Sequence, residues 1–277
     1  MGRLQGGRAV TIEMVREGAV ALIELSHGKA NEMGSEQVAA FDSICDELEK
    51  GGVRALITWS RRRSSRGTPI FIAGANVTER TGWSQEQVRA HVRNQRRVLN
   101  RVRNLPLLHI CVVNGVALGW GTEFVLTCDY RIAASEASFG LPETGLGILP
   151  GAGGTAELWS QIGLPQALRL GMTGEKISAA EAERIGLVQE VAEGVDEGLE
   201  RAKALAARVA RNSPTAVAAF KRAALGVVGL PAAEREELEA QAYEHCLDSG
   251  EAAIGRENFA AIRKGEEVPW GPLVLQG

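Results

Sequence analysis

The stretch from residue 107 to residue 154 constrains the fold of this chain more than any other. Its first part, residues 107–113, is an apolar run rich in β-branched residues and too short for a long helix, which predicts a buried strand. An Asn-Gly pair at 114–115 breaks the run, and two glycines flank Trp120 just before an apolar helical segment. A strand that ends in a Gly-rich turn and opens a helix leaves backbone N–H groups free, and these favour negative charge. The stretch therefore predicts an α/β unit whose turn presents hydrogen-bond donors.

Two glutamates follow in the same stretch. Glu123 sits at the start of the predicted helix, and Glu143 comes after a second predicted strand, 130–134, and a turn. The intervening chain is long enough to go out and return, so both carboxyl groups could face one pocket. On the residues alone, Glu123 could equally be a helix-start charge and Glu143 a solvated turn residue. The segment Pro-Gly-Ala-Gly-Gly at 150–154 predicts a backbone that lies close to another chain segment or to a ligand.

The composition argues against several classes of protein. The chain has 277 residues, of which 45% are hydrophobic and 23% charged, and its net charge is −3. These values are typical of a globular protein with one α/β core, and the negative charge argues against a general nucleic-acid or membrane binder. No run approaches the roughly 18 apolar residues of a membrane span, and the first residues lack the apolar core of a signal peptide.

The cysteines and histidines suggest neither a disulfide framework nor a metal site. The four cysteines (Cys45, Cys111, Cys128 and Cys246) are scattered without CxxC spacing. The four histidines are also scattered, so we expect no metal. A reducing cytoplasm is the default location for such a chain.

Alternating strand and helix signals organise the rest of the chain. Two strands joined at Glu17-Gly18 are predicted over residues 8–25, a helix capped by Ser35 runs to about Lys50, and an apolar strand covers 53–59. This alternation predicts a largely parallel sheet with helical crossovers. Ser84 has capping-box spacing before a helix whose residues 89–103 include seven basic or histidine side chains.

The C-terminal third is predicted to be helical. Ser178 has capping-box spacing before a short helix, and a short strand follows at 187–191. Long helices are predicted at about 195–211, 214–225 (with Ser213 as cap), 231–248 and 250–264. These helices have more apolar residues on their faces than packing at the edge of one domain would require, which is consistent with packing against other subunits.

Four motifs in the same order resemble the crotonase (enoyl-CoA hydratase/isomerase) superfamily. They are FIAGANVTE at 71–79, VNGVALGWGTE at 113–123, CDYRIA at 128–133 and FGLPETGLGILPGAGGT at 139–155. The resemblance implies an α/β crotonase fold, with a repeated ββα spiral core that binds acyl-CoA over residues 1–195. It also implies a C-terminal helical trimerisation region over residues 196–277, and hence a homotrimer or a hexamer formed as a dimer of trimers.

The resemblance also assigns roles to residues. It implies a lyase, an enoyl-CoA hydratase, that adds water to a 2-enoyl-CoA to give a 3-hydroxyacyl-CoA. Glu123 and Glu143 match the two catalytic glutamates, and the backbone N–H groups of Ala75 and Trp120 match the oxyanion hole. Two carboxyl groups suit the deprotonation of water and the delivery of a proton, and two N–H donors suit a thioester oxygen that gains charge.

The remaining matches concern substrate and coenzyme A. The expected contact residues are Ala30, Ala73, Gly74, Asn76, Gly119, Phe259 and Lys264. The last two belong to a segment that resembles one reaching the adenine nucleotide of a neighbouring subunit. Coenzyme A enters as part of the substrate, so no separate cofactor is expected. A basic residue that often follows residue 76 in the family is absent, which makes Arg80 and the loop 61–66 candidates for the phosphates. Trp120 stands where many family members have Gly, and we hypothesise that it alters acyl selectivity, with its indole either lining the acyl site or pointing into the core.

Other functions remain open at this point. An enoyl-CoA isomerase would need only one of the two glutamates, and other crotonase-type acyl-CoA reactions use the same fold. A non-catalytic or RNA-associated scaffold would use the basic helix at 89–103. The negative net charge and the aromatic content of 5% argue against a nucleic-acid partner.

Overall fold

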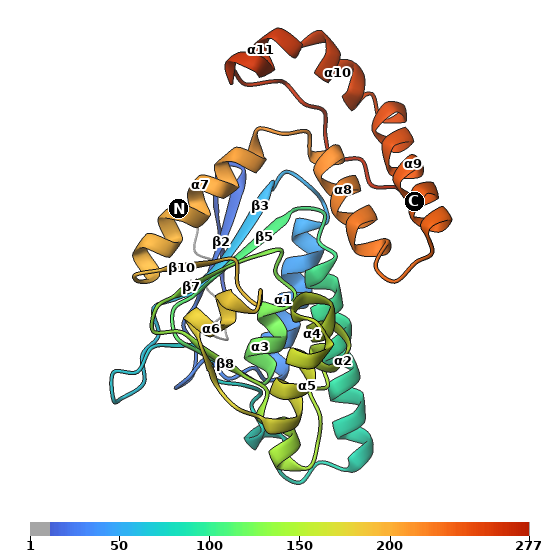
Figure 1. Ribbon diagram of the computed structural model, residues 1–277. Helices are drawn as coiled ribbons and strands as arrows, with labels where there is room; N and C mark the ends of the chain where they lie inside the picture. The colour runs from blue at the N-terminus through green and yellow to red at the C-terminus, as the bar shows by residue number, and fades with distance from the viewer. Residues whose placement is uncertain (1–11, 277) are drawn as a thin grey trace.

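The fold is a spiral whose turns place strands alternately in two β-sheets (Figure 1). The computed structural model describes residues 12–276, so residues 8–11 of the predicted first strand lie outside the described residues. The larger sheet contains, in spatial order, β1 (Met14–Glu17), β2 (Val20–Leu25), β3 (Ala55–Ser60), β5 (Leu108–Val113), β7 (Tyr130–Ala134) and β10 (Glu190–Ala192). Only the β1–β2 pair is antiparallel. The predicted hairpin and largely parallel sheet are thus confirmed.

A second, smaller sheet was not predicted. It contains β4 (Ile70–Ile72), β6 (Val116–Leu118), β8 (Ser138–Gly140) and β9 (Ile177–Ser178), and β4, β6 and β8 are parallel neighbours. Each of these strands has only two or three residues, too few to show a periodic pattern. β6 in particular lies where the sequence suggested a turn alone. In successive turns of the spiral, β3 is followed by β4, β5 by β6, and β7 by β8, so that each turn adds one strand to each sheet, which is the repeated unit of the expected crotonase fold.

Helices and short 3₁₀ segments connect the turns of the spiral. They are α1 (Ser35–Leu48), η1 (Thr78–Arg80), α2 (Gln85–Arg103), α3 (Trp120–Val125), η2 (Pro142–Leu146), α4 (Gly154–Ile162), α5 (Leu164–Thr173) and α6 (Ala179–Arg184). The predicted caps at Ser84 and Ser178 are confirmed, because each hydroxyl accepts the N–H of the residue three positions on. The predicted cap at Ser35 is wrong. Ser35 is the first helical residue, and its N–H donates to the Glu79 carboxylate at 3.0 Å.

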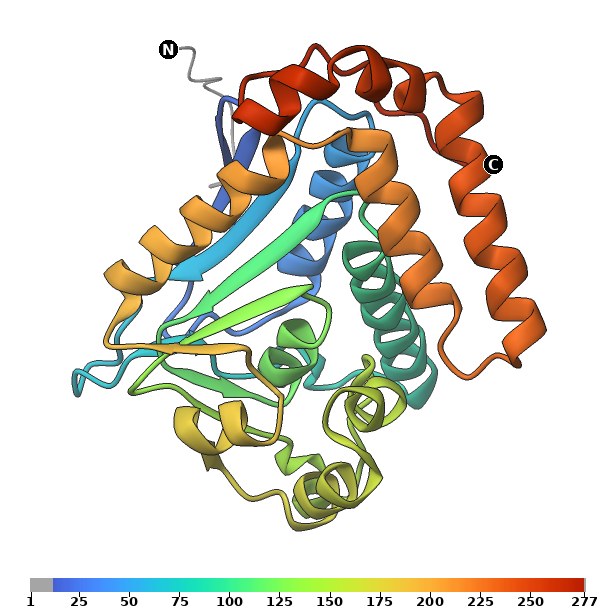
Figure 2. The same cartoon turned by 45° about the horizontal axis from the view of Figure 1, so that its top comes forward.

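The central strands β3, β5 and β7 of the larger sheet are buried on both faces. Along β5, the side chains of Ile110 and Val112 pack toward α7 (Val195–Ala210), which lies along one face of the sheet in Figure 2. The alternate residues Cys111 and Val113 pack into the main core with α1, α2 and α3. This alternation follows from the two-residue period of a strand. It explains why the strand reads as a continuous apolar run.

The C-terminal helices extend away from the spiral (Figure 1). They are α8 (Pro214–Gly226), α9 (Ala232–Asp248), α10 (Glu251–Glu257) and α11 (Phe259–Lys264). The predicted helices are therefore confirmed, and the last one is divided at Asn258. The division of the chain at residue 195 stays a prediction, although α7, which follows it, packs on the larger sheet. Across residues 12–276, no helix combines the length and apolar character that a membrane crossing requires.

Candidate active site

The candidate site lies where three neighbouring strands of the smaller sheet end. A cavity of about 680 Å³ opens there. The residues after β4, after β6 and after β8 all line it, because the carboxyl ends of parallel neighbours meet at one edge of a sheet. Seven of the predicted residues share this cavity, namely Ala73, Gly74, Ala75, Gly119, Trp120, Glu123 and Glu143.

Within residues 12–276, two backbone N–H groups at the cavity have no regular backbone partner. Ala75 forms a parallel bridge with Met33, but the bonds of that bridge come from the N–H groups of Met33 and Asn76, at 3.0 and 2.8 Å. The N–H of Ala75 is therefore outside the bridge. Trp120 is the first residue of α3, and the first N–H groups of a helix have no acceptor within it. Both groups are thus available to a ligand oxygen.

The Glu123 carboxylate is buried and held by a loop. The side chain is only 3% exposed. Its Oε1 accepts the N–H of Ala152 at 2.7 Å and that of Gly154 at 2.9 Å. Burial raises the pKa of Glu123 to about 7, and the charge of Glu143 adds to the rise, whereas the two N–H donors and Arg96 oppose it. The Glu123 carboxyl group therefore titrates close to neutral pH.

Glu143 lies on η2 and is packed against a glycine. A Cβ atom added at Gly119 would stand 2.5 Å from Glu143 Oε1, so the carboxyl group occupies the space that a side chain at 119 would need. Gly119 also has φ +52°, in the left-handed region that favours glycine. Glu143 Oε2 is buried and has no hydrogen-bond partner among the described residues. Burial raises the pKa of Glu143 above its ordinary value.

The Trp120 indole points into the core, one of the two orientations considered. Its ring stacks on Phe124, with centroids 5.7 Å apart and planes at 21°, and lies 6.4 Å from Phe41. The side chain is 3% exposed, while the residue still borders the cavity. An effect of Trp120 on acyl selectivity stays a prediction.

Four predicted contact residues are not among those that line the cavity. Ala30 is adjacent, because its carbonyl accepts the Ala73 N–H at 3.1 Å, and Asn76 donates its N–H to Met33. Phe259 and Lys264 lie on α11, at the end of the molecule opposite α5 (Figure 1). Their expected contact with coenzyme A concerned a neighbouring subunit, so all four roles stay predictions.

The loop at 150–154 has a role that the sequence did not specify. Its glycines predicted close approach to another segment, and that segment is the Glu123 side chain. The sequence placed Arg96 only within the basic helix at 89–103, and the structure shows that its Nε donates to the carbonyl of Gly151 at 2.9 Å. A buried carboxylate needs partners, and this requirement is the signal that could have identified the loop.

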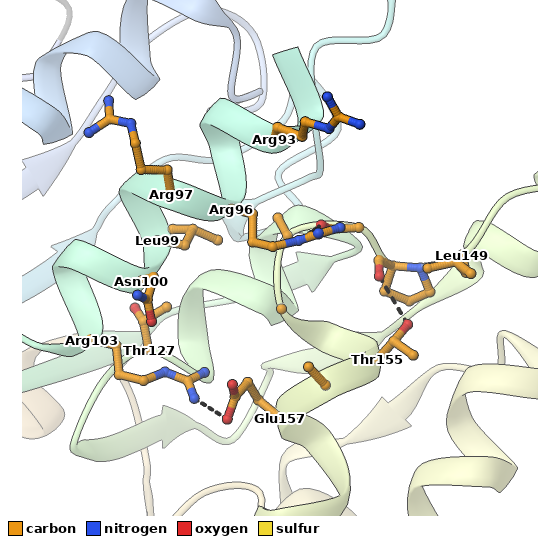
Figure 3. Close-up of a pocket in the computed structure, with 15 residues that line it drawn as sticks. Arg93, Arg96, Arg97, Leu99, Asn100, Arg103, Thr127, Leu149, Thr155 and Glu157 are labelled. Atoms are coloured by element: carbon orange, nitrogen blue, oxygen red, sulfur yellow. Dashed lines mark hydrogen bonds and ion pairs between the residues drawn. The ribbon is translucent and has the colours of Figure 1, made fainter. Parts of the chain in front are cut away.

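A second cavity of about 610 Å³ adjoins the first across this loop (Figure 3). Four arginines of α2 line it, namely Arg93, Arg96, Arg97 and Arg103. Arg97 pairs with Asp42, and Arg103 pairs with Glu157 on α4. Arg96 contributes to the walls of both cavities.

Comparisons with known proteins agree with this fold. The sequence family described as enoyl-CoA hydratase/isomerase matches residues 16–267. A short-chain-enoyl-CoA hydratase of Clostridium acetobutylicum is 34% identical over 251 residues, which are 90% of this chain and 94% of that protein. An enoyl-CoA isomerase/hydratase of Mycosarcoma maydis is 36% identical over 197 residues, 71% of this chain and 72% of that protein.

A solved structure extends the likeness to three dimensions. The crystal structure of an enoyl-CoA hydratase from Bacillus anthracis has a TM-score of 0.85 and 34% identity, and covers 94% of this chain and 98% of that one. The fold is thus the crotonase fold, as the four motifs implied. The chain belongs to the enoyl-CoA hydratase/isomerase family.

Proposed function

We propose that this protein hydrates a 2-enoyl-CoA to a 3-hydroxyacyl-CoA. The observation that carries the proposal is one cavity lined by two glutamates together with the two available N–H groups of Ala75 and Trp120. Hydration needs all four groups, whereas a shift of a double bond needs only one acid–base carboxyl group. The family and the named hydratase relative support this choice.

The two N–H groups would bind the thioester oxygen. When water adds to the β-carbon, electrons move through the conjugated system and negative charge develops on that oxygen. Donors fixed by the backbone of Ala75 and Trp120 stabilise this charge without reorganising, and a single donor of this kind is typically worth roughly 3–4 kcal/mol. Trp120 adds the favourable end of a short helix dipole.

The glutamates would divide the proton transfers. Two N–H donors bind Glu123 Oε1 and favour the carboxylate form, so Glu123 is suited to take a proton from water as the oxygen attacks the β-carbon. Glu143 has an unpartnered buried oxygen and a raised pKa, so it is suited to hold a proton and deliver it to the α-carbon. One proton is taken and one is given, so the addition of water is balanced. The reverse reaction exchanges the two roles.

The cavity walls suit an acyl thioester. Apolar side chains from the start of α2 and from residues 146–149 line it, including Val88, Val92 and Leu146. We expect no metal or redox cofactor to be required, because the thioester itself acidifies the α-carbon. Coenzyme A would enter as part of the substrate, and a cytoplasmic location stays a prediction.

We also infer that the C-terminal helices assemble the protein as a homotrimer or as a dimer of trimers. Phe220 on α8 is 76% exposed and Tyr243 on α9 is 68% exposed, and both line an apolar groove between these helices. Large apolar side chains gathered in this way are typical of subunit interfaces. Light scattering coupled to size-exclusion chromatography would give three or six times the chain mass of 29.5 kDa. A monomer at micromolar concentration would contradict the inference.

The hydratase proposal is tested by following the absorbance of the conjugated enoyl thioester. The panel contains short, branched and aromatic 2-enoyl-CoAs, and Glu123→Gln and Glu143→Gln are assayed beside the wild-type protein. We expect hydration of at least one substrate and a loss of kcat by orders of magnitude in both variants. The order of substrates in the panel defines the acyl class.

Other outcomes would point elsewhere. Conversion of a 3-enoyl-CoA to the conjugated thioester, without water uptake and with dependence on one glutamate only, would replace the proposal with an isomerase. No turnover of any acyl-CoA, together with salt-sensitive RNA binding that is lost on neutralising Arg93, Arg96 and Arg97, would replace it with a scaffold.

A further inference from the structure

We propose that Arg96 is a positioning residue that holds the Glu123 carboxylate in place through the peptide group between Gly151 and Ala152. The role rests on the proposed function, because it concerns the residue that would activate water. Arg96 itself is not given a part in the chemistry.

One peptide group links the two side chains. Arg96 Nε donates to the carbonyl oxygen of Gly151 at 2.9 Å. The N–H of the same peptide group, which belongs to Ala152, donates to Glu123 Oε1 at 2.7 Å. A hydrogen bond from a guanidinium to a carbonyl polarises the peptide group, which makes its N–H a stronger donor on the other side. Arg96 therefore both fixes the orientation of this peptide and strengthens its contact with Glu123.

The loop needs such an anchor because its backbone is permissive. Three of the four residues from 151 to 154 are glycines, and Gly153 has φ +131°. Within the loop, Thr155 Oγ1 donates to the Pro150 carbonyl at 3.0 Å, which closes a turn but does not connect it to α2. The contact from Arg96 is made across 55 positions of sequence and ties the loop to a long helix.

The neighbouring arginines are used differently. In Figure 3, the Arg96 side chain extends from α2 toward the loop, whereas those of Arg93 and Arg97 point away from it. Arg97 pairs with Asp42 on α1. For Arg93, no hydrogen bond or ion pair is found within residues 12–276. Arg93 therefore offers a matched control on the same helix, with the same charge and outside the catalytic cavity.

The charge of Arg96 also acts on the titration of Glu123. The charged groups that share the cavity with Glu123 are Glu143 from η2, Arg96 from α2 and Arg80 from η1. The charge of Arg96 lowers the pKa of Glu123, in opposition to burial and to Glu143. Removing Arg96 should thus leave Glu123 protonated at a higher pH.

The test measures kcat and KM for 2-enoyl-CoA hydration between pH 5 and pH 9 in Arg96→Met, Arg96→Lys and Arg93→Met. We expect Arg96→Met to lower kcat roughly 10- to 100-fold, the scale of a misplaced catalytic group, and to move the acidic limb of the profile to higher pH. Arg96→Lys should recover part of both effects, because an ammonium group restores the charge and can donate to Gly151. Arg93→Met should resemble the wild-type protein.

Two results would overturn the inference. In the first, Arg96→Met raises KM while kcat and the acidic limb stay unchanged, which would make Arg96 a substrate contact only. In the second, Arg93→Met has the same effect as Arg96→Met, which would make the general charge of the cavity responsible.

A second readout does not depend on turnover. Glu123→Gln removes a titrating group, so the difference in unfolding free energy between Glu123→Gln and its parent varies with pH. This variation should be larger in the Arg96→Met background than in the wild-type background. If the protein hydrates no 2-enoyl-CoA and the variation still grows, the proposed function fails and the inference on Arg96 stands. If the protein is a hydratase and the variation is the same in both backgrounds, Arg96 does not act on Glu123.

Discussion

Replacing Glu123 with Gln should make the protein more stable at neutral and alkaline pH while it destroys activity. The Gln Oε1 can still accept the N–H groups of Ala152 and Gly154, so the hydrogen bonds of the loop are kept. What is lost is the cost of holding a charged carboxylate at a site that is 3% exposed. The variant thus separates the stability of the fold from the requirement of the chemistry.

The raised pKa sets the size of the effect. The pKa of Glu123 rises from an ordinary 4.5 to about 7, mainly through burial. The folded protein therefore binds more protons than the unfolded chain between these values, and its stability falls as pH rises through this window. A rise of 7 − 4.5 = 2.5 corresponds to about 3 kcal/mol at 1.36 kcal/mol per pKa unit. Gln does not titrate, so Glu123→Gln should match the wild-type protein at low pH and exceed it by about 3 kcal/mol above pH 7.

Urea unfolding followed by tryptophan fluorescence, at one protein concentration and from pH 5 to pH 8.5, measures this difference. The exposed Glu47 on α1 provides a control, because Glu47→Gln removes the same charge without burial. A difference between Glu123→Gln and wild type that stays constant with pH would refute the reasoning. So would a difference that grows equally for Glu47→Gln.

Three further changes test other parts of the structure. Gly119→Ala should reduce kcat at least 100-fold in the hydration assay, because the new Cβ would stand 2.5 Å from Glu143 Oε1 and the residue has a positive φ. In Gly145→Ala the new Cβ would meet nothing within 4 Å, so this control should keep near-normal turnover. Lys221→Met should lower the free energy of unfolding by about 1–3 kcal/mol at pH 7, because the half-buried Asp129 loses its ion-pair partner at 2.7 Å and is left with the N–H of His109; adding Asp129→Asn should recover part of that loss in urea unfolding. Asn31→Ala should lower the free energy of unfolding by about 2–4 kcal/mol, again measured in urea. Asn31 has φ +52°, and its side-chain amide donates to the carbonyl of Phe71 at 2.8 Å and to the hydroxyl of Ser60 at 3.1 Å. An unchanged urea midpoint would contradict this prediction.

The longer elements of the fold could be predicted from the sequence, whereas most of the smaller sheet could not. The buried strand at 108–113 and the helix at 85–103 show clear apolar patterns and a clear cap at Ser84. The strands of the smaller sheet have no such pattern, because two or three residues are placed by their neighbours and not by their own propensity. The cap of α1 was predicted wrongly because the acceptor of the Ser35 N–H is the Glu79 carboxylate, which is distant in sequence. The spiral itself was predicted only through the family resemblance.

Seven of the eleven predicted site residues line one cavity, whereas the contacts that support Glu123 were not predicted. The motifs identified both glutamates and both N–H donors, and the structure brings them to one cavity. The contacts of Glu123 with Ala152 and Gly154, and that of Arg96 with Gly151, join segments 29 to 55 residues apart. Periodicity and local motifs carry no information about such pairs. The orientation of the Trp120 indole was left open for the same reason, since it depends on contact with Phe41 of α1.

The alternation of the spiral between two sheets has a consequence for how this scaffold tolerates change. Ala75 follows β4 and Trp120 follows β6, and these strands are parallel neighbours. Adjacent strands lie about 4.8 Å apart, a spacing suited to two donors that converge on one oxygen. The geometry of the donors is therefore set by the pairing of these strands and by the bridge of Ala75 to Met33, and not by the length of chain between them. Exposed connections outside these strands, such as the loop at 61–68 before β4, can lengthen, shorten or change sequence while the donors keep their spacing.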